Sequence, residues 1–558
     1  MDVMDGAIRM VALVAVCLLM TPPAQAAEYM VDTNNPVASD SGPGNAQIPF
    51  KTILKGVKHR NPGDTVTIRA GLYREWVKFT VEGTFDRPIT IQAAPGDEGK
   101  VVIMGSDLVT NWKREHGVLW SSEWKYKMES NYPADWDDYG AYGHRCEMVF
   151  VDGEPLKQVL AKGELARGTF FVDENAGRIY IALRKPSDTT GNVEVATRQL
   201  GVSVEGQFVK MRGLTVKYVP NDYKMAAFNA VCNNSEFRDI RAEWNNLDGL
   251  RFVGRQIQAV NNTAVHNGRC GISASIYDCL LEGNRTDDNS WRFGPEWHAG
   301  GMKIVGEGPS NNRIIRHVSN NNNGRGIWFD YNCRNNRVEN CVMDNNLIAG
   351  LEFEACNGPN WAVNNVISRT RIWRDSLTEQ ASGAGIVLYE SNDTRIYNNT
   401  VVGNERCGLL LAGGARKISY DKTETYCAQT QIYNNIFADN GESVFRFWVW
   451  DRSAAPGAVE SHRGDYNLFF LPKRAFMALL PADKRAVTLA DWREAFKQDA
   501  HSIEADPLFA NPAKQDYRLR SESPVIGAGT ALSKIDAVAG VVEEPGKPVN
   551  LGALSAEK

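Results

Sequence analysis

The stretches "GRGIWFDYNC" (residues 324–333) and "AGLEFEACNG" (residues 349–358) share one shape: after a glycine, every second residue is apolar, and a carboxylate ends the run. The two carboxylates are Asp330 and Glu354. Alternation with a period of two is typical of a β-strand, in which successive side chains point to opposite faces. The two stretches therefore predict equivalent strands of consecutive repeats.

The same pattern, a glycine followed by alternating apolar residues, recurs through the middle of the chain. It begins at residues 249, 271, 301, 326, 350, 385 and 408, so most repeats are about 24 residues long. Short strands at this spacing, with Asn and Gly at the corners and no helical periodicity, are typical of a solenoid. We therefore predict an all-β protein, a right-handed parallel β-helix of the pectate-lyase-like kind. Longer connections before residues 301 and 385 predict inserted loops, which commonly form the binding face of a solenoid.

Aligning the repeats on their glycines predicts which side chains face inward. The first and third residues after each glycine are apolar in six repeats, so we expect them in the core. The second and fourth residues should then point outward. The chemically distinctive members of these outward columns are Arg251, Lys303, Trp328 and Glu352 at the second place, and Asp330, Glu354 and Tyr389 at the fourth.

The presence or absence of the repeat pattern divides the rest of the chain into segments. Residues 1–26 combine one arginine, an apolar run and an Ala-x-Ala ending, which predicts a secretory signal peptide cut after Ala26 and a secreted or periplasmic protein. The alternative, a membrane anchor, needs a longer apolar run. We expect N-terminal coils over 27–107, an inserted small β-sandwich-like domain over 108–200, active-site coils over 201–440, and C-terminal coils with a cap over 441–558. An amphipathic helix near residues 488–499 would form part of that cap.

Composition excludes several classes of partner. Charged residues make up 23% of the chain and the net charge is −5, with no block of either sign, so we expect no nucleic acid and no basic membrane surface. No later stretch is apolar enough to span a membrane. The cysteines lack C-x-x-C spacing, which argues against a zinc site and a disulfide framework; we expect buried thiols and no metal.

The paired carboxylates carry the functional prediction. Neighbouring strands lie about 4.8 Å apart, and two charges at about 5 Å repel by roughly 3 kcal/mol at an effective dielectric constant of 20. Their pKa values should split, leaving one acid protonated. A retaining glycosidase needs two carboxyl groups about 5–5.5 Å apart. Trp328 and Tyr389 would offer faces on which a sugar ring could stack, and Lys303, Glu352 and Arg251 would bind or tune the substrate.

Three alternatives stay open at this point. Outward acids on a solenoid are commonly only solvated, and outward aromatic residues can be ordinary strand residues. Three clustered carboxylates also suit calcium, in which case the protein would be a uronic-acid polysaccharide lyase or epimerase, with Lys303 or Arg251 as the base. A non-catalytic carbohydrate-binding surface protein would keep the aromatic residues without needing either acid.

The catalytic stretches also resemble a known family. "GRGIWFDYNCRNNRVENC" (324–341) and "LEFEACNGPNWAVNNVI" (351–367) resemble the catalytic coils of the β-helix β-xylosidases of glycoside hydrolase family 120. The resemblance implies an inserted β-sandwich, Asp330 as nucleophile and Glu354 as general acid/base. We expect an oligo- or polysaccharide substrate and no cofactor, with calcium possible if the lyase alternative holds. That family carries a glutamate shortly before the lysine strand, where this sequence has His298. His298 could hydrogen-bond to Asp330, stand in for that acid, or be a structural histidine at a corner of the coil.

Overall fold

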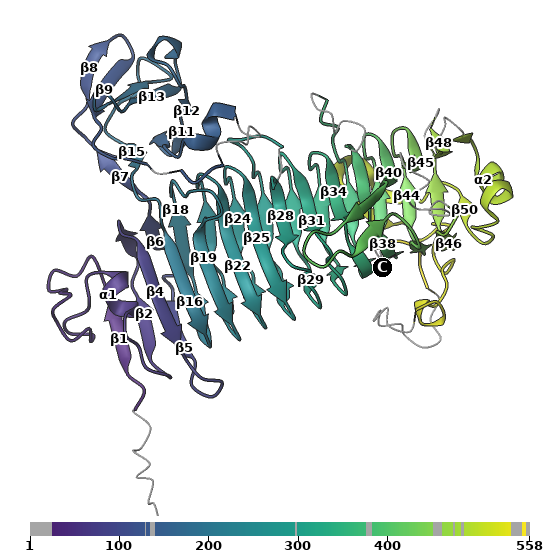
Figure 1. The fold of residues 1–558 in the computed structure, drawn as a ribbon, viewed down its shortest axis with the longest axis horizontal. Helices are drawn as coiled ribbons and strands as arrows, with labels where there is room; N and C mark the ends of the chain where they lie inside the picture. The colour runs from purple at the N-terminus through teal and green to yellow at the C-terminus, as the bar shows by residue number, and fades with distance from the viewer. Residues whose placement is uncertain are drawn as a thin grey trace, which may run out of the picture.

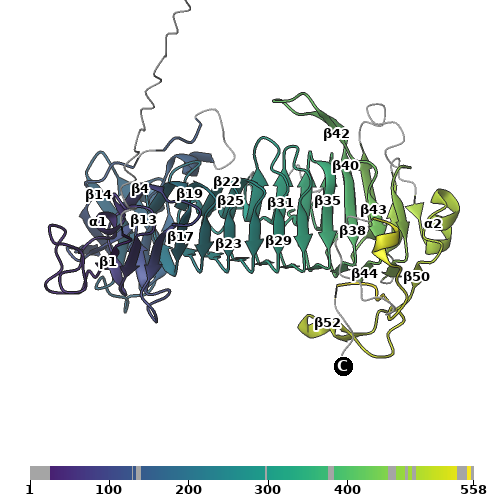
Figure 2. The ribbon, with the colours of Figure 1, turned by 90° about the horizontal axis from the view of Figure 1, so that it is seen from below.

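The computed structural model describes residues 25–128, 130–133, 140–295, 298–374, 382–449, 460–471, 475–480, 485–536 and 549–553. Three long parallel sheets run side by side along the molecule and form an elongated stack of coils (Figures 1 and 2). The protein is a right-handed parallel β-helix, as predicted. We name the sheets after their first strands: the β1 sheet, the β3 sheet and the β4 sheet.

Each sheet has 13 strands. The β1 sheet contains β1 (Glu28–Val31), β2 (Thr65–Ile68), β5 (Ile89–Ala93), β17 (Val209–Arg212), β20 (Glu236–Arg238), β23 (Gln258–Val260), β26 (Leu280–Glu282), β29 (Arg313–Ile315), β32 (Arg337–Glu339), β35 (Asn357–Val363), β38 (Asn392–Tyr397), β43 (Gln431–Tyr433) and β46 (Arg463–Asp465). The β3 sheet contains β3 (Gly71–Tyr73), β6 (Val101–Met104), β18 (Leu214–Lys217), β21 (Arg241–Glu243), β24 (Thr263–Val265), β27 (Arg285–Asp287), β30 (Val318–Asn320), β33 (Val342–Asp344), β36 (Val366–Ser368), β39 (Thr400–Val402), β44 (Ile436–Ala438), β47 (Leu468–Phe470) and β50 (Ile503–Glu504). The β4 sheet contains β4 (Val77–Glu82), β16 (Val202–Gln207), β19 (Ala226–Asn233), β22 (Asp248–Arg255), β25 (Cys270–Tyr277), β28 (Gly300–Val305), β31 (Arg325–Asp330), β34 (Ala349–Glu354), β37 (Ala384–Tyr389), β40 (Cys407–Gly413), β45 (Ser443–Val449), β48 (Phe476–Leu479) and β49 (Arg485–Ala486).

The inward side chains of the β4 sheet form the core along with apolar residues of the other two sheets. Because alternation places the first and third residues after each repeat glycine on one face, these residues stack from coil to coil. The predicted inward residues are all buried in one continuous apolar cluster: Leu250, Phe252, Ile272, Ala274, Met302, Ile304, Ile327, Phe329, Leu351, Phe353, Ile386 and Leu388. The predicted orientation of the strands is therefore confirmed.

Asparagine ladders hold the corners of the coils. Asn245 donates to Asn267, Asn267 to Asn289, Asn289 to Asn322 and Asn322 to Asn346, each amide nitrogen lying 2.9–3.0 Å from the next amide oxygen. All five side chains are buried. Because a buried amide must find partners for both its donors and its acceptor, the ladder fixes one coil above the next.

The described cysteines are buried free thiols, as predicted for the six that fall in the repeats. They are Cys146, Cys232, Cys270, Cys279, Cys333, Cys341, Cys356, Cys407 and Cys427. Two of them lie at corners of the coils and accept hydrogen bonds there. The Cys279 sulfur accepts from the backbone N–H of Ile257 at 3.2 Å, and the Cys341 sulfur accepts from that of His317 at 3.3 Å. These thiols serve as small apolar residues with a weak acceptor.

A separate small domain interrupts the solenoid between β6 and β16. Its two sheets contain β7 (Ser106–Val109), β8 (Lys113–His116), β9 (Leu119–Glu123), β10 (Val149–Val151), β11 (Glu154–Pro155), β12 (Lys157–Gln158), β13 (Thr169–Asp173), β14 (Arg178–Ala182) and β15 (Val193–Ala196). The domain has its own apolar core and lies against one edge of the N-terminal coils (Figure 1). The rings of Phe150 and Tyr218 stack 3.9 Å apart between the domain and the solenoid.

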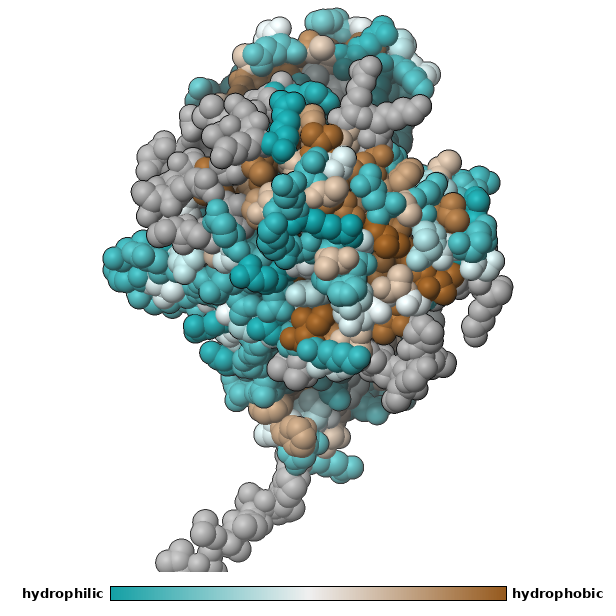
Figure 3. All heavy atoms as spheres, turned by 90° about the vertical axis from the view of Figure 1, so that its right-hand side faces the viewer, coloured by the Kyte–Doolittle hydropathy of each residue, from teal (hydrophilic) through white to brown (hydrophobic). Residues whose placement is uncertain are grey.

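Two helices lie near the ends of the solenoid. Helix α1 (Ile53–Val57) packs beside β1 and β4, and α2 (Leu489–Phe496) covers the other end, where Trp492 lies 5.2 Å from Phe445 between ring centroids. The helix predicted near residues 488–499 is therefore present. Figure 3 looks onto this end and shows mainly hydrophilic side chains with smaller apolar patches between them.

A hairpin of β41 (Ala415–Lys417) and β42 (Glu424–Tyr426) projects from the solenoid after β40 (Figure 2). A second antiparallel pair, β51 (Phe509–Asn511) and β52 (Asp516–Leu519), lies near the C-terminus. Among the described residues, no helix is long and apolar enough to cross a membrane. The predicted signal peptide falls on residues 1–26, of which residues 1–24 lie outside the described part of the chain.

Candidate active site

The two predicted catalytic acids are direct neighbours in the β4 sheet. Asp330 ends β31 and Glu354 ends β34, and the parallel register pairs these two residues. The same register pairs Trp328 with Glu352. None of the four belongs to the apolar core inside the solenoid. The structure therefore places the acids on the outer face of adjacent coils, as the alignment of the repeats predicts.

Each of three outward carboxylates is paired with its own cation. Lys303 Nζ lies 2.9 Å from Asp330 Oδ2, Arg325 Nε lies 2.7 Å from Glu352 Oε2, and Arg416 Nη1 lies 2.8 Å from Glu354 Oε1. Arg416 also contacts the carboxylate of Glu390. The cations relieve the repulsion that two adjacent carboxylates would otherwise feel at this separation.

This outer face is covered, which corrects part of the prediction. Lys303, Trp328 and Glu352 are only 1–3% exposed, so they form a buried layer beside the acids and present no open surface to a sugar. Lys303 Nζ lies 3.2 Å from the centroid of the Trp328 ring, and Arg325 Cζ lies 4.0 Å from it. Because cations lie against its ring, Trp328 supports the charged layer by cation–π contacts. The stacking role predicted for Trp328 is wrong for this structure.

Tyr389 is the aromatic side chain that keeps partial exposure here. It ends β37, pairs in register with Glu354, and lies 5.6 Å from Arg416 Cζ, measured to the ring centroid. Burial raises the pKa of Tyr389 to about 12, so it stays protonated at neutral pH. Its position beside Glu354 fits the predicted contact with a substrate.

The environment splits the pKa values of the two acids. Burial raises the pKa of Asp330 and the nearby charge of Glu354 adds to this, against the opposing effect of Lys303. Burial also acts to raise the pKa of Glu354, but Arg416, Lys303 and Arg325 outweigh it, so the pKa of Glu354 falls below its ordinary value. Burial raises the pKa of Glu352 as well. The predicted split is present, with the ionised form favoured at Glu354.

His298 and Arg251 lie further along the β4 sheet, away from the acids. His298 Nε2 is 3.7 Å from Asp248 Oδ2, and Asp248 pairs with Arg269 at 2.7 Å in a buried ion pair. Arg251 donates a hydrogen bond of 2.9 Å to Asn229 Oδ1. Of the roles considered for His298, a hydrogen bond to Asp330 is not present: the carboxylate beside it is Asp248, on a strand three places before that of Asp330 in the sheet. Burial lowers the pKa of His298 well below its ordinary value, so it is neutral at pH 7.

Sequence reasoning missed three members of the site. Arg325 precedes a repeat glycine and lies outside the aligned columns. Glu390 follows Tyr389 with a backbone φ of 51°, and this left-handed corner breaks the alternation that placed the other residues. Arg416 belongs to the projecting hairpin, which has no counterpart in the repeats. The only signal for Arg416 in the sequence is the adjacent pair of basic residues Arg416 and Lys417 after "GLLLAGG". This pair does not indicate which acid Arg416 contacts.

The three clustered acids also bear on the calcium alternative. Within the described ranges, no group of three or more His, Cys, Asp or Glu side chains is arranged to hold a metal ion. Asp330, Glu352 and Glu354 each use an oxygen on a different cationic side chain. The prediction that the protein needs no metal remains a prediction.

The fold and site together define a right-handed parallel β-helix with a covered, ion-paired cluster of acids on one sheet. A family model described as periplasmic copper-binding protein (NosD) matches residues 300–446, less than half of the chain. A curated relative, the uncharacterized protein YwoF of Bacillus subtilis (strain 168), is 20% identical over 503 residues, which cover 88% of this chain and 91% of that protein.

Solved structures resemble the chain in fold. A structure of XylC in complex with xylose aligns with a TM-score of 0.61 and 15% identity over 87% of each chain. A second, described as a glycoside hydrolase, aligns with a TM-score of 0.49 and 12% identity over 85% of this chain and 99% of that one. At 15% identity, the likeness to XylC extends to the β-helix fold and leaves the activity to be argued from the site.

Proposed function

We propose that the protein is a retaining glycoside hydrolase that acts on oligosaccharides derived from polysaccharides, with Asp330 and Glu354 as its two catalytic carboxyl groups. The observation that carries the proposal is their register: the two acids end adjacent strands of one sheet on its outer face. Adjacent strands lie about 4.8 Å apart, close to the carboxyl separation of about 5–5.5 Å that a retaining mechanism requires.

In this mechanism one carboxylate attacks the anomeric carbon, while the other carboxyl group protonates the departing oxygen and then activates water. The family resemblance assigns the attack to Asp330 and the acid/base role to Glu354. Lys303 would then favour the carboxylate form of Asp330, against the burial that raises its pKa. Glu354 would have to take up a proton, which requires Arg416 to move off its carboxylate as substrate binds. The family resemblance suggests a β-xylosidase-like activity, and XylC, which shares the fold, was solved with xylose.

The proposal includes export from the cytoplasm, on the strength of the signal sequence expected over residues 1–26. A uronic-acid lyase or epimerase would need a free base beside the sugar, and Lys303 is instead buried in an ion pair. This favours hydrolysis over proton abstraction by that lysine.

A panel of aryl glycosides, offered to the wild type and to Asp330→Asn and Glu354→Gln, tests the proposal. We expect cleavage of at least one glycoside by the wild type and a loss of at least about 10²-fold in kcat/KM in both variants. An unsaturated product absorbing in the ultraviolet, formed from a uronic-acid polymer, would instead show a lyase. Full activity in either variant would refute the assignment.

A further inference from the structure

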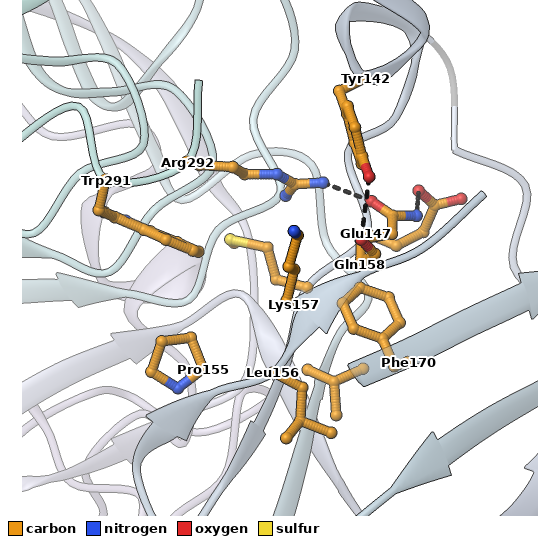
Figure 4. Close-up of a pocket in the computed structure, with 11 residues that line it drawn as sticks. Tyr142, Glu147, Pro155, Leu156, Lys157, Gln158, Phe170, Trp291 and Arg292 are labelled. Atoms are coloured by element: carbon orange, nitrogen blue, oxygen red, sulfur yellow. Dashed lines mark hydrogen bonds between the residues drawn. The ribbon is translucent and has the colours of Figure 1, made fainter. Parts of the chain in front are cut away.

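A cavity of about 350 Å³ lies between the inserted domain and the solenoid (Figure 4). Its walls come from two parts of the chain that are distant in sequence. The inserted domain contributes residues of β10 to β13, including Leu156, Lys157 and Phe170, and the connection between β27 and β28 contributes Trp291 and Arg292. Its volume is within the range of ordinary small-molecule sites, which is about 300–1,000 Å³.

Flat apolar side chains line opposite sides of this cavity. The ring of Trp291 is fixed from outside, because its Nε1 donates a hydrogen bond of 2.8 Å to the carbonyl oxygen of His266 and its ring packs edge-on against Trp244. Phe170 lies across the cavity from Trp291 and is buried in the core of the domain (Figure 4). The structure therefore presents rigid ring faces without needing a ligand to order them.

Two cations reach the same cavity. Arg292 donates to Asn246 Oδ1 and to Gln158 Oε1, each at 2.6 Å, so its strong partners are neutral amides. Burial lowers the pKa of Arg292 to about 10, which still leaves it charged at pH 7. Lys157 also lines the cavity, and its side chain is exposed to solvent (Figure 4).

The acid that lines the cavity does not cancel this charge. Glu147 is paired with Arg145, whose Nη2 lies 2.7 Å from Glu147 Oε1, and it also accepts a hydrogen bond of 3.0 Å from Gln158 Nε2. Arg145 Nη1 also lies 3.4 Å from Glu174 Oε1, so Arg145 is shared between two acids. Among these described residues, the three cations Arg145, Lys157 and Arg292 outnumber the two acids, which leaves one net positive charge next to the apolar ring faces.

We infer that this cavity binds an acidic sugar, a uronic-acid unit of the substrate. A pyranose ring has apolar C–H faces that suit Trp291, and a uronic acid carries one carboxylate, the group that Lys157 and Arg292 can bind together. This inference rests on the proposed function for the choice of a carbohydrate. A neutral sugar would leave both cations without a counter-charge, and an inorganic anion would leave the ring faces unused.

The cavity is distinct from the two acids. Trp291 and Arg292 lie on the connection that leads into the start of β28, whereas Asp330 and Glu354 are the last residues of β31 and β34. At about 3.3 Å per residue, a six-residue strand separates these edges by roughly 16 Å. A single sugar ring cannot reach both places, so the cavity would hold an acidic unit remote from the bond that is cleaved.

Binding measured by calorimetry on the full-length Asp330→Asn protein tests the inference without turnover. The probes are glucuronic and galacturonic acid and their oligomers, with glucose, galactose and benzoate for comparison. We expect the uronic acids to bind at least tenfold more tightly than the neutral sugars and benzoate, and Lys157→Gln and Arg292→Gln to lose about tenfold of that affinity. Lys185→Gln, an exposed lysine of the same domain, is the matched control and should bind normally.

Equal affinity for neutral and acidic sugars, tighter binding of benzoate, or no binding of any uronic acid would overturn the inference. Because Lys157 is exposed, the Lys157→Gln protein should fold even if Arg292→Gln does not. In an otherwise wild-type background, the control Lys185→Gln should leave the cleavage of a small neutral aryl glycoside unchanged. Uronic-acid binding without any glycosidase activity would refute the proposed function and leave this site standing.

Discussion

Lys303 and Asp330 form a buried ion pair between adjacent strands, with 2.9 Å from Nζ to Oδ2 and side-chain exposures of 1% and 9%. Such a pair gains little net stability, because both charges lose their hydration. Removing one partner is costly, since the other charge is left buried. Lys303 therefore favours the ionised form of Asp330, but it only partly offsets burial, so the pKa of Asp330 stays above its ordinary value.

Replacing Lys303 with Met should make stability more sensitive to pH. Without the ammonium, the pKa of Asp330 rises further above its ordinary value of about 3.9. A carboxyl group with a higher pKa in the folded state binds more protons there, so stability falls as pH rises from the unfolded pKa towards the folded one. Thermal unfolding midpoints between about pH 4 and pH 8 should fall more steeply than in the wild type. Parallel curves for Lys303→Met and the exposed control Lys51→Met would contradict this.

Replacing Arg416 with Gln should raise the pKa of Glu354, because Arg416 is the strongest of the charges that lower it. If Glu354 is the general acid/base, it must be protonated for the first step, so the alkaline limb of the kcat/KM profile should move to higher pH. If Glu354 is the nucleophile, it must be ionised, and the acidic limb should move to higher pH instead. The resemblance-based assignment predicts the first result, and a shift of only the acidic limb would reverse the two roles.

Replacing Trp328 should mainly lower stability, whereas replacing Tyr389 should mainly weaken substrate binding. Trp328→Leu removes a buried ring that packs against Lys303 and Arg325, so we expect a loss of stability on the order of 3 kcal/mol. Tyr389→Leu, at a partly exposed ring, should change stability less and raise KM by up to about tenfold. Unfolding midpoints and Michaelis constants measure the two effects. A raised KM in Trp328→Leu at unchanged stability would restore its predicted role in stacking.

The asparagine ladder should be a main support of the active-site coils. Asn322→Ala removes the oxygen that accepts from both the backbone N–H and the side-chain amide of the buried Asn289, while Asn346 keeps only the hydrogen bond from the backbone N–H of residue 322. An unsatisfied buried polar group costs about 1–3 kcal/mol. We expect a loss of this size in chemical unfolding, compared with a small change for the exposed residue Asn175 replaced with Ala. An Asn322→Ala protein as stable as the wild type would show that the ladder is not needed.

Much of the solenoid was predictable because a period of two and a repeat near 24 residues fix both the strands and their inward faces. Ile327, Phe329, Leu351 and Phe353 follow from alternation alone, and so does the pairing of the acids. Alternation shows only that a side chain points away from the solenoid core. It does not show what covers that side chain, which is why Trp328 was expected to be open and is buried.

The cations that complete the site could not be placed by the same reasoning. Arg416 lies in a hairpin 62 residues after Glu354 in the sequence, and only folding brings the two side chains together. The uronic-acid cavity is likewise formed by two segments that contact across domains, with Arg292 and Gln158 134 residues apart. Long-range contacts of this kind leave no periodic trace in a single sequence.

The stereochemistry of cleavage tests the central claim most directly. Proton NMR of the first product released from an aryl glycoside reports the anomeric configuration before the sugar mutarotates. Two carboxyl groups on adjacent strands predict a product with the same anomeric configuration as the substrate. A first product of the opposite configuration would mean that water attacks directly, and the pairing of Asp330 with Glu354 would then not be the catalytic pair.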